Sequence, residues 1–447
     1  MAEDVKVPEG WRRVRLGEIS EIVKGITYKS SDYCESEEGA TFINLKCILK
    51  KGGFNKDGLK YFKGLIRESQ ILRKGDIIIA IVDLTRDGDI IGYPLRVPDF
   101  GSNKVVTMSM DVVKIEPDAQ IDKAFLYYRL CLNDIHSYIL SISAGSTVLH
   151  LDLNWLPQLE FSVPLSLPEQ HKIAEILETV DNAIEKTDRI IEKYKRIKQG
   201  LMQDLLTRGI VESDELGVRS YELRDEKKHK FKDSPLGRIP EEWEVVEFKD
   251  ICKVRQGLQI AIANRFKEPG PKRYIYITIQ YLNSNDKDED AEYIQNPPKS
   301  VICGKDDLLM SRTGNTGMVI TGVEGVFHNN FFLVDYDKKE VDKMYLFYYL
   351  NLPWIQEEIR ALAGSTTIPD LNHNDFYSLK FLKPPLPEQK RIASILSQID
   401  EAIEKEQKYK EKLERIKKGL MEDLLMGKVR VNHLIEENKS LERVENV

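Results

Sequence analysis

Two 40-residue segments of this chain have nearly the same sequence. LPEQHKIAEILETVDNAIEKTDRIIEKYKRIKQGLMQDLL begins at Leu167, and LPEQKRIASILSQIDEAIEKEQKYKEKLERIKKGLMEDLL begins at Leu386. They align without a gap, with about 24 identical residues, and a repeat of this length indicates two copies of one unit. A unit that binds something would therefore bind two of it.

Each copy has the sequence of one long helix. Pro168 and Pro387 suit the first helical position, where no backbone N–H is required. Glu169 and Glu388 follow, near the positive end of the helix dipole. At 1.5 Å per residue, about 39 residues form a helix of roughly 58 Å, which is longer than an isolated globular helix usually is. This length favours a coiled coil.

Apolar residues in both copies follow the 4-3 spacing of a coiled-coil seam. We predict that the helices pack through Ile173, Leu177, Val180, Ile184, Leu201, Leu205, Ile392, Leu396, Ile399, Ile403, Leu420 and Leu424. The middle of the seam is polar, with Thr187 and Lys198 in the first copy and Glu406, Lys410 and Lys417 in the second. Polar seam positions reduce stability but can fix register and orientation.

The repeat extends beyond the helices. Three further motifs occur twice: PEGW from Pro8 and PEEW from Pro240, FLYYRL from Phe125 and LFYYL from Leu346, and AGST from Ala144 and from Ala363. The regions between these motifs differ in length and in sequence. Two matched scaffolds with unmatched middle regions are expected of a protein that reads two different targets.

The composition is that of a soluble globular protein. Charged residues make up 31% and hydrophobic residues 41% of the 447 positions, and the length accommodates two large units. We find no apolar run as long as a membrane span and no signal-peptide core at the N-terminus. The cysteines are odd in number, scattered and without CxxC spacing (Cys34, Cys47, Cys131, Cys252 and Cys303). They indicate reduced thiols in a cytoplasm and offer no zinc site.

The net charge of −7 argues against a nucleic-acid binder, but basic residues gather locally. Nine basic and two acidic residues lie between Lys46 and Lys74, with Phe54, Tyr61 and Phe62 among them. A second basic segment runs from position 253 to 273. Basic segments with interleaved aromatic residues suit contact with phosphates, although a solvated lysine-rich loop is an open alternative.

Two glycine-containing loops follow predicted strands. These are SRTGNTG from Ser311 and IVDLTRDGDIIG from Ile81. Their glycines would let the backbone approach a partner, and their arginines could reach a phosphate or a guanine edge, although plain hairpin turns remain an alternative. Our candidate DNA contacts are Lys46, Lys50, Lys51, Lys56, Arg86, Asn103, Lys104, Arg255, Arg265, Lys272, Arg312, Thr313, Asn315 and Asn329.

Motifs of catalysis are incomplete. NPPK from Asn296 resembles the NPP(F/Y/W) motif of amino-methyltransferases, but Lys299 stands at the aromatic position and no glycine-rich cofactor loop accompanies it. The sequence contains no GxxxxGK[ST], no HExxH and no serine-hydrolase elbow. We therefore predict no catalytic residue, no metal ligand and no cofactor in this chain.

The layout resembles the specificity subunit of type I restriction–modification systems. Two variable regions each precede a long helix that opens with LPEQ, and FKDSPLGRIPEEWEVV from Phe231 resembles the opening of that family's second target recognition domain. GLMQDLL and GLMEDLL resemble the ends of its two conserved helices. The resemblance covers nearly the whole chain.

The resemblance implies a mixed α/β protein that reads DNA without catalysing a reaction. Each target recognition domain would read one half of a split DNA sequence, and the two helices would pack as an antiparallel coiled coil that fixes the distance between the domains. The helices would also bind methyltransferase subunits, through which a nuclease/translocase subunit joins. S-adenosylmethionine, ATP and Mg would belong to those partners.

We divide the chain accordingly. The predicted parts are target recognition domain 1 (1–166), conserved helix 1 (167–210), a linker (211–235), target recognition domain 2 (236–385), conserved helix 2 (386–427) and a polar tail (428–447). Two other interpretations remain open at this point: a methyltransferase or nuclease that carries its own specificity domain, and a coiled-coil assembly protein with no role on DNA.

Overall fold

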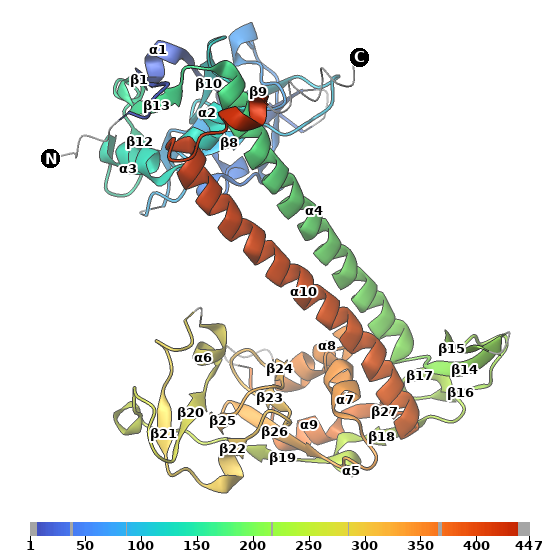
Figure 1. Cartoon of the computed structure of the whole chain (residues 1–447). Coiled ribbons are helices and arrows are strands. Elements are labelled where there is room, and N and C mark those ends of the chain that lie inside the picture. The colour runs from blue at the N-terminus through green and yellow to red at the C-terminus, as the bar shows by residue number, and fades with distance from the viewer. Residues whose placement is uncertain are drawn as a thin grey trace. The chain divides into compact units, whose positions relative to one another are not determined.

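The computed structural model of the chain describes residues 7–35, 39–85, 87–215, 218–284, 286–364 and 369–436. These residues form two compact units (Figure 1). Unit 1 comprises residues 1–188 and 408–447, and unit 2 comprises residues 189–407. Each unit therefore contains one globular domain and one half of each long helix.

In unit 1 the globular domain is built on antiparallel strands with helices packed against them. Strand β1 (Trp11–Arg15) pairs with β13 (Glu160–Pro164), which directly precedes the first long helix. The central sheet has the order β2 (Ser20–Lys24), β10 (Val112–Pro117), β6 (Ile77–Ala80), β8 (Pro94–Arg96). The helices are α1 (Leu16–Ile19), α2 (Lys123–Leu130) and α3 (Asn133–Ser141). Ile77, Ile79 and Val113 of the sheet share one buried core with Phe125 and Leu126 of α2.

A second sheet of unit 1 lies in the region without a sequence match in unit 2. Its order is β3 (Tyr33–Cys34), β5 (Lys60–Phe62), β4 (Ala40–Ile43), β9 (Val106–Met108). Strands β4 and β9 are parallel. A small third sheet has the order β11 (Ser143–Ala144), β12 (Leu149–Leu151), β7 (Val82–Asp83).

Unit 2 repeats the terminal strand pair and the strand order of the central sheet. Strand β18 (Glu244–Glu247) pairs with β27 (Lys380–Lys383) before the second long helix. The central sheet has the order β19 (Cys252–Gln256), β26 (Phe331–Tyr336), β23 (Leu309–Ser311), β24 (Val319–Ile320). The other sheet has the order β21 (Tyr293–Gln295), β20 (Arg273–Ile277), β25 (Gly325–Phe327), β22 (Ile302–Cys303), with β20 and β25 parallel. The helices are α5 (Phe248–Ile251), α6 (Ile279–Asn283), α7 (Lys343–Leu350), α8 (Pro353–Ala363) and α9 (His373–Ser378). The middle regions have therefore diverged in sequence while keeping the strand order of the central sheet.

The two repeats form the helices α4 (Leu167–Leu205) and α10 (Leu386–Leu425). Within unit 1, Lys410 pairs with Asp188 at 2.7 Å and Lys417 with Asp181 at 2.6 Å. Residue numbers rise along one helix as they fall along the other, so the helices are antiparallel (Figure 1). The polar seam positions of the sequence thus include lysines that form ion pairs between the helices.

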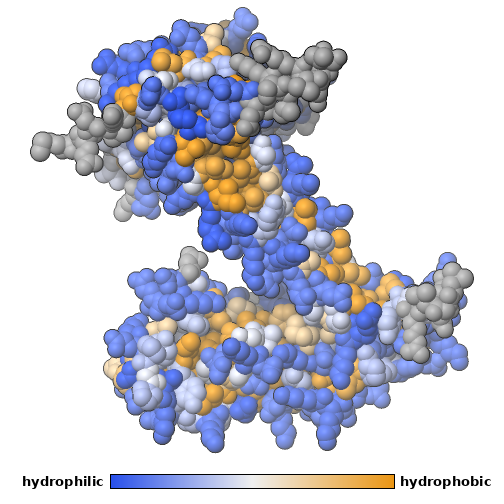
Figure 2. Space-filling view, in the orientation of Figure 1, coloured by the Kyte–Doolittle hydropathy of each residue, from blue (hydrophilic) through white to orange (hydrophobic). Residues whose placement is uncertain are grey.

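The predicted seam residues differ in burial. Ile173, Leu177 and Leu205 of α4 and Ile392, Leu396 and Leu424 of α10 are buried, while Val180, Ile184, Leu201, Ile399, Ile403 and Leu420 are half-buried. The fully buried residues lie at the helix ends, where they join the cores of the globular domains. Figure 2 accordingly shows hydrophobic residues gathered in patches beside a largely hydrophilic helix surface.

Two segments that the sequence placed outside the domains are folded. The predicted linker at 211–235 contains most of two hairpins, β14 (Ile210–Glu215) with β15 (Val218–Leu223) and β16 (Phe231–Ser234) with β17 (Gly237–Pro240). In the predicted polar tail, Val431 is 2% exposed and belongs to the core of unit 1. The polar, charged composition of both segments concealed these structures. The core partners of Val431 also lie far away in the sequence, whereas each hairpin pairs neighbouring strands.

One pair of glycines is required by close backbone contact in both units. A Cβ atom on Gly25 would lie 1.9 Å from the Ser109 carbonyl oxygen, and one on Gly257 would lie 2.2 Å from the Phe327 carbonyl oxygen. We expect Gly25→Ala and Gly257→Ala each to lower the free energy of unfolding by about 1–3 kcal/mol or more, because backbone must move. Urea unfolding followed by circular dichroism measures the change.

Gly200 provides the control for these substitutions. It lies inside α4, and apart from its chain neighbours and the backbone of its own helix, no heavy atom lies within 4 Å of the position of an added Cβ. Gly200→Ala should raise the free energy of unfolding by about 0.5–1 kcal/mol, because alanine favours the helix. If Gly25→Ala were as stable as Gly200→Ala, the close approach at Gly25 would not constrain the fold.

Candidate nucleic-acid interface

The predicted lysines of unit 1 lie together on one exposed segment. Lys46, Lys50, Lys51 and Lys56 occupy three consecutive 3-10 turns, Leu45–Cys47, Lys50–Gly52 and Lys56–Gly58, and all four side chains are exposed. The segment is anchored by Cys47 and Ile48, which are buried in a hydrophobic cluster separate from the main core of unit 1. A hydrogen bond to Asp89 raises the pKa of Lys50, so this lysine stays charged. The segment therefore exposes several cations close together in the sequence, which suits phosphate contact.

The other candidates of unit 1 lie on two loops. Asn103 and Lys104 are exposed on the connection between β8 and β9, where Asp99 accepts a hydrogen bond from the backbone of Gly101 at 2.9 Å. The loop after β7 is folded around Asp83, whose carboxylate accepts hydrogen bonds from the backbone N–H groups of Ile90 (2.7 Å) and Ile91 (2.9 Å). Arg86 of this loop lies outside the described residues.

Two predicted arginines of unit 2 are held within the domain. Arg265 forms an ion pair with Glu292 at 2.8 Å and donates to the Ile260 carbonyl oxygen at 2.7 Å. Arg255 donates to the Ser300 carbonyl oxygen at 2.8 Å. Both guanidinium groups thus form contacts within the domain itself. Lys272, by contrast, is exposed at a turn, where its φ is 56°.

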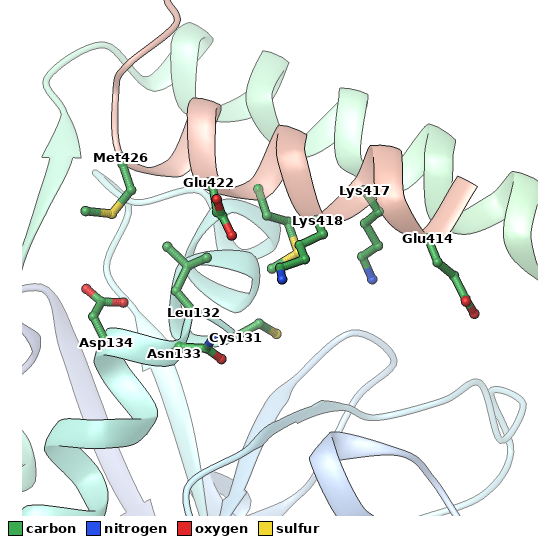
Figure 3. A pocket seen from close by; sticks show the side chains of 10 residues that line it. Cys131, Leu132, Asn133, Asp134, Glu414, Lys417, Lys418, Glu422 and Met426 are labelled. Carbon is green, nitrogen blue, oxygen red and sulfur yellow. The ribbon is translucent and has the colours of Figure 1, made fainter. Parts of the chain in front are cut away.

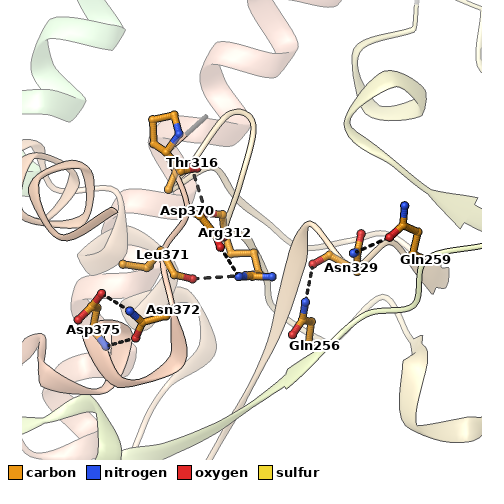
Figure 4. Close-up of polar contacts among 10 residues, drawn as sticks. Gln256, Gln259, Arg312, Thr316, Asn329, Asp370, Leu371, Asn372 and Asp375 are labelled. Atoms are coloured by element: carbon orange, nitrogen blue, oxygen red, sulfur yellow. Dashed lines mark hydrogen bonds and ion pairs between the residues drawn. The ribbon is translucent and has the colours of Figure 1, made fainter. Parts of the chain in front are cut away.

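The SRTGNTG loop connects the antiparallel strands β23 and β24, so it is a hairpin turn, which was the alternative interpretation of its sequence. Arg312 is paired with Asp370 at 2.6 Å (Figure 4). Thr313 forms an isolated backbone β-bridge with the same residue. Asn315 at the tip is exposed. The loop is therefore fixed at its base, with an amide side chain at its tip.

Sequence reasoning missed two glutamines beside this loop. Gln256 donates to the Asn329 carbonyl oxygen and the Asn329 amide donates to Gln259, both at 3.3 Å (Figure 4). Gln256 and Gln259 are exposed. They flank Gly257, so a Q-G-x-Q pattern after a strand was the available signal. Amide side chains of this kind can read adenine through paired hydrogen bonds.

The glutamine of LPEQ attaches each long helix to its recognition domain. The Gln170 amide donates to the Pro164 carbonyl oxygen at 2.9 Å and accepts from the Asp122 N–H at 2.8 Å. The Gln389 amide donates to the Pro384 carbonyl oxygen at 2.8 Å and accepts from the Asp342 N–H at 2.9 Å. Asp122 and Asp342 are the N-caps of α2 and α7. The same contact thus joins helix and domain in both units.

The glutamate of each LPEQ motif binds an arginine that follows the other long helix in the sequence. Glu169 holds Arg430 through two hydrogen bonds of 2.6 and 2.9 Å, and Glu388 holds Arg224 in the same manner. Glu388 also accepts from the Trp243 indole at 3.1 Å and from the Ile210 N–H at 2.9 Å. Besides their favourable position near the positive end of the helix dipole, these glutamates therefore hold an arginine from a distant part of the chain.

A groove of about 460 Å³ lies in unit 1 between the α2–α3 corner and the last turns of α10 (Figure 3). Leu132 and Cys131 line it on one side, and Lys417, Met421 and Met426 on the other. Burial raises the pKa of the Cys131 thiol to about 12, so the thiol is protonated at neutral pH. The groove is mixed in character and presents no group of catalytic side chains.

The described residues contain neither a metal-binding cluster nor a helix that could span a membrane. Within the described ranges, no group of three or more histidine, cysteine, aspartate or glutamate side chains is arranged to hold a metal ion. Among the same residues, no helix is long and apolar enough to cross a membrane.

Two domains with the same strand order in the central sheet, each packed on half of the antiparallel helix pair, define an internally duplicated two-domain protein. The family model for the type I restriction modification DNA specificity domain matches residues 8–195 and 240–415. The chain therefore belongs to this family.

Similar proteins cover nearly the whole chain. The MjaVIII specificity subunit of Methanocaldococcus jannaschii is 27% identical, covering 96% of this chain and 95% of that protein. The EcoBI specificity subunit of Escherichia coli is 23% identical over 88% of this chain and 80% of that protein. These findings support the interpretation as a specificity subunit and not the alternative of an enzyme with its own specificity domain.

Solved structures show the same fold. The S subunit of the type I restriction–modification system from M. genitalium superposes with a TM-score of 0.59 at 16% identity, covering 95% of this chain and 98% of that chain. A chain from a study of complex assembly in a type I system has a TM-score of 0.53 at 17% identity, covering 95% and 100%.

Proposed function

We propose that this chain reads a split DNA sequence, with one half-site read by each unit, and that the antiparallel helices set the gap between the half-sites. The observation that carries the proposal is the duplication of one domain topology on a shared helix pair, with unrelated exposed loops in the two copies. A helix of about 58 Å corresponds to about 17 base-pair steps of 3.4 Å, which is enough for two half-sites and a gap.

The exposed side chains of the two units differ in the DNA contacts that they could make. In unit 1, Lys46, Lys50, Lys51 and Lys56 supply the phosphate contacts that position a domain on DNA. In unit 2, Asn315, Gln256 and Gln259 supply amides suited to base edges, and exposed Lys272 supplies a positive charge. Asn103, Lys104, Thr313, Arg312 and Asn329 complete the set of proposed contacts.

Catalysis is assigned to partners. The chain binds methyltransferase subunits through its helices, and a nuclease/translocase subunit joins through those. S-adenosylmethionine, ATP and Mg serve the partners, and the specificity chain itself is not an enzyme. The complex acts in the cytoplasm, where the five free cysteines remain reduced.

Exchange of one recognition domain tests the proposal. Replacing residues 8–165 with the corresponding region of another family member should change one half-site completely and leave the other half-site and the gap as they were. Sequencing of methylated adenines in cells that contain the methyltransferase subunits gives all three quantities at once. A change in both half-sites would contradict the modular interpretation.

A further inference from the structure

A tyrosine of unit 1 joins both long helices through one carboxylate. The Tyr128 hydroxyl of α2 donates to Asp181 of α4 at 2.7 Å, and Lys417 of α10 pairs with the same carboxylate at 2.6 Å. The Lys417 ammonium also lies 5.8 Å from the centre of the Tyr128 ring. We call Tyr128, Asp181 and Lys417 the first polar triad.

The same arrangement recurs in unit 2 with the helices exchanged. The Tyr348 hydroxyl of α7 donates to Asp400 of α10 at 2.7 Å, and Lys198 of α4 pairs with Asp400 at 2.6 Å. The Lys198 ammonium lies 5.2 Å from the centre of the Tyr348 ring. Tyr348, Asp400 and Lys198 are the second polar triad.

Each copy of the repeat contributes to both triads. The aspartate begins DNAIEK in α4 and DEAIEK in α10, and the lysine lies in RIKQG and RIKKG. One helix therefore gives its aspartate to the unit in which it begins and its lysine to the other unit. The recurrence in two units with diverged middle regions shows that the geometry follows from the repeat and from the aromatic motif before it.

We propose that the two polar triads are positioning clamps that fix the angle of each recognition domain on the helix pair, and thereby restrict the protein to one gap length. This inference rests on the proposed function. It assigns Tyr128 and Tyr348 as positioning residues for specificity, without contact to DNA.

Each recognition domain is attached by polar contacts at two points along one long helix, and the second point can restrict rotation of the domain about the first. Gln170 attaches the domain at the start of α4, and Asp181 does so 11 residues later, about 16 Å along the helix. Gln389 and Asp400 are separated by the same distance in α10. The apolar contact between these points is non-directional, so it allows pivoting that a second polar contact prevents.

The tyrosines are suited to this role at every physiological pH. Both rings are buried, at 1% and 0% exposure. Burial, with the adjoining aspartate, raises the pKa of Tyr128 and of Tyr348 above the ordinary value. Each phenol therefore stays protonated and donates to a carboxylate whose charge the lysine balances, which makes a strong and directional hydrogen bond.

Unit 1 has an additional contact at the same place. Arg96 of β8 pairs with Glu178 of α4 at 2.8 Å and lies over the Tyr127 and Tyr128 rings. The corresponding position in α10 is Ser397, whose hydroxyl is 3.2 Å from the Tyr348 hydroxyl. Loss of the tyrosine hydroxyl should therefore loosen unit 2 more than unit 1.

The test compares Tyr128→Phe, Tyr348→Phe and the double variant in the complete methyltransferase complex, in cells that lack the nuclease subunit. Methylated adenines are mapped across the genome. We expect methylation at correct half-sites whose gap is one base pair too long or too short to rise about tenfold over wild type in the double variant, as loss of a charge-assisted hydrogen bond allows. Tyr348→Phe should give the larger single effect.

Lys410→Met is the matched control. Lys410 pairs with Asp188 and Glu414, which belong to the helices, so this variant perturbs the helix pair and leaves the triads intact. Its gap selectivity should equal that of wild type. If the phenylalanine variants do not assemble, Lys198→Met with Lys417→Met takes their place, with the same relaxation of the gap expected.

Several results would overturn the proposal. Unchanged gap selectivity in the double variant would do so, as would a uniform loss of methylation at all gap lengths or a failure of both variant sets to assemble, because each result indicates a purely structural role. A wild-type complex that methylates no split sequence would instead overturn the proposed function, so the two failures are distinguishable.

Discussion

Insertion of four residues into both long helices should widen the gap between the half-sites by one or two base pairs. The insertions are placed after Asp188 in α4 and after Gln407 in α10, where the two compact units divide. Four helical residues add about 6 Å, compared with 3.4 Å per base-pair step. The sequence of each half-site should stay the same, because the recognition domains are untouched. A genome-wide map of methylated adenines measures both quantities.

The control replaces four residues at each site with the inserted sequence and keeps the helix lengths. This variant should read the original gap. An insertion in α4 alone should reduce methylation at every gap, because it moves the seam of one helix out of register with the other by a full turn. An unchanged gap in the doubly lengthened protein would show that the helices do not set the distance.

Glu388→Ala should lower the free energy of unfolding by about 3–5 kcal/mol, which is the cost of leaving a buried charge without its partner. The Arg224 side chain is 8% exposed and loses both hydrogen bonds to the carboxylate, which leaves it, among the described residues, only the exposed Glu242 carboxylate at 3.9 Å. The Trp243 indole and the Ile210 N–H lose their acceptor in the same step. Urea unfolding of the purified chain, followed by circular dichroism, measures the loss.

Glu169→Ala provides the comparison in unit 1. The Arg430 side chain is 30% exposed, so water can hydrate it when Glu169 is removed, and we expect a smaller loss of about 1–3 kcal/mol. Equal losses for the two variants would show that solvent access to the arginine does not decide the cost. Stability unchanged by Glu388→Ala would show that the four hydrogen bonds at this carboxylate contribute nothing net.

The helices and the duplication could be predicted from the sequence because their signals are local and repeated. The 4-3 spacing gives the seam, and LPEQ gives the helix start. Strands β6 and β20 were also predictable, since β-branched and aromatic residues cluster in their sequences IIIA and RYIYI. The shared strand order of the two central sheets was not, because it depends on pairings between segments without common sequence.

The candidate site was predictable only in part, because long-range partners decide which charges face outward. Arg255 and Arg265 belong to a basic segment, yet Ser300 and Glu292 hold their side chains inside the domain. Lys198 and Lys417 were visible only as polar interruptions of the seam. Their partners in the polar triads lie on other elements, far away in the sequence, so no local pattern reveals them.

The division of the chain has a consequence for its synthesis on the ribosome. Unit 2 is one continuous segment, 189–407, whereas unit 1 needs residues from both sides of it. The Glu169–Arg430 ion pair closes a separation of 261 residues. At translation rates of about 5–20 residues per second, at least about 13 seconds pass between the two residues. Unit 1, whose domain emerges first, therefore lacks its second helix while unit 2 is synthesised. Unit 2 can finish folding before unit 1 is complete.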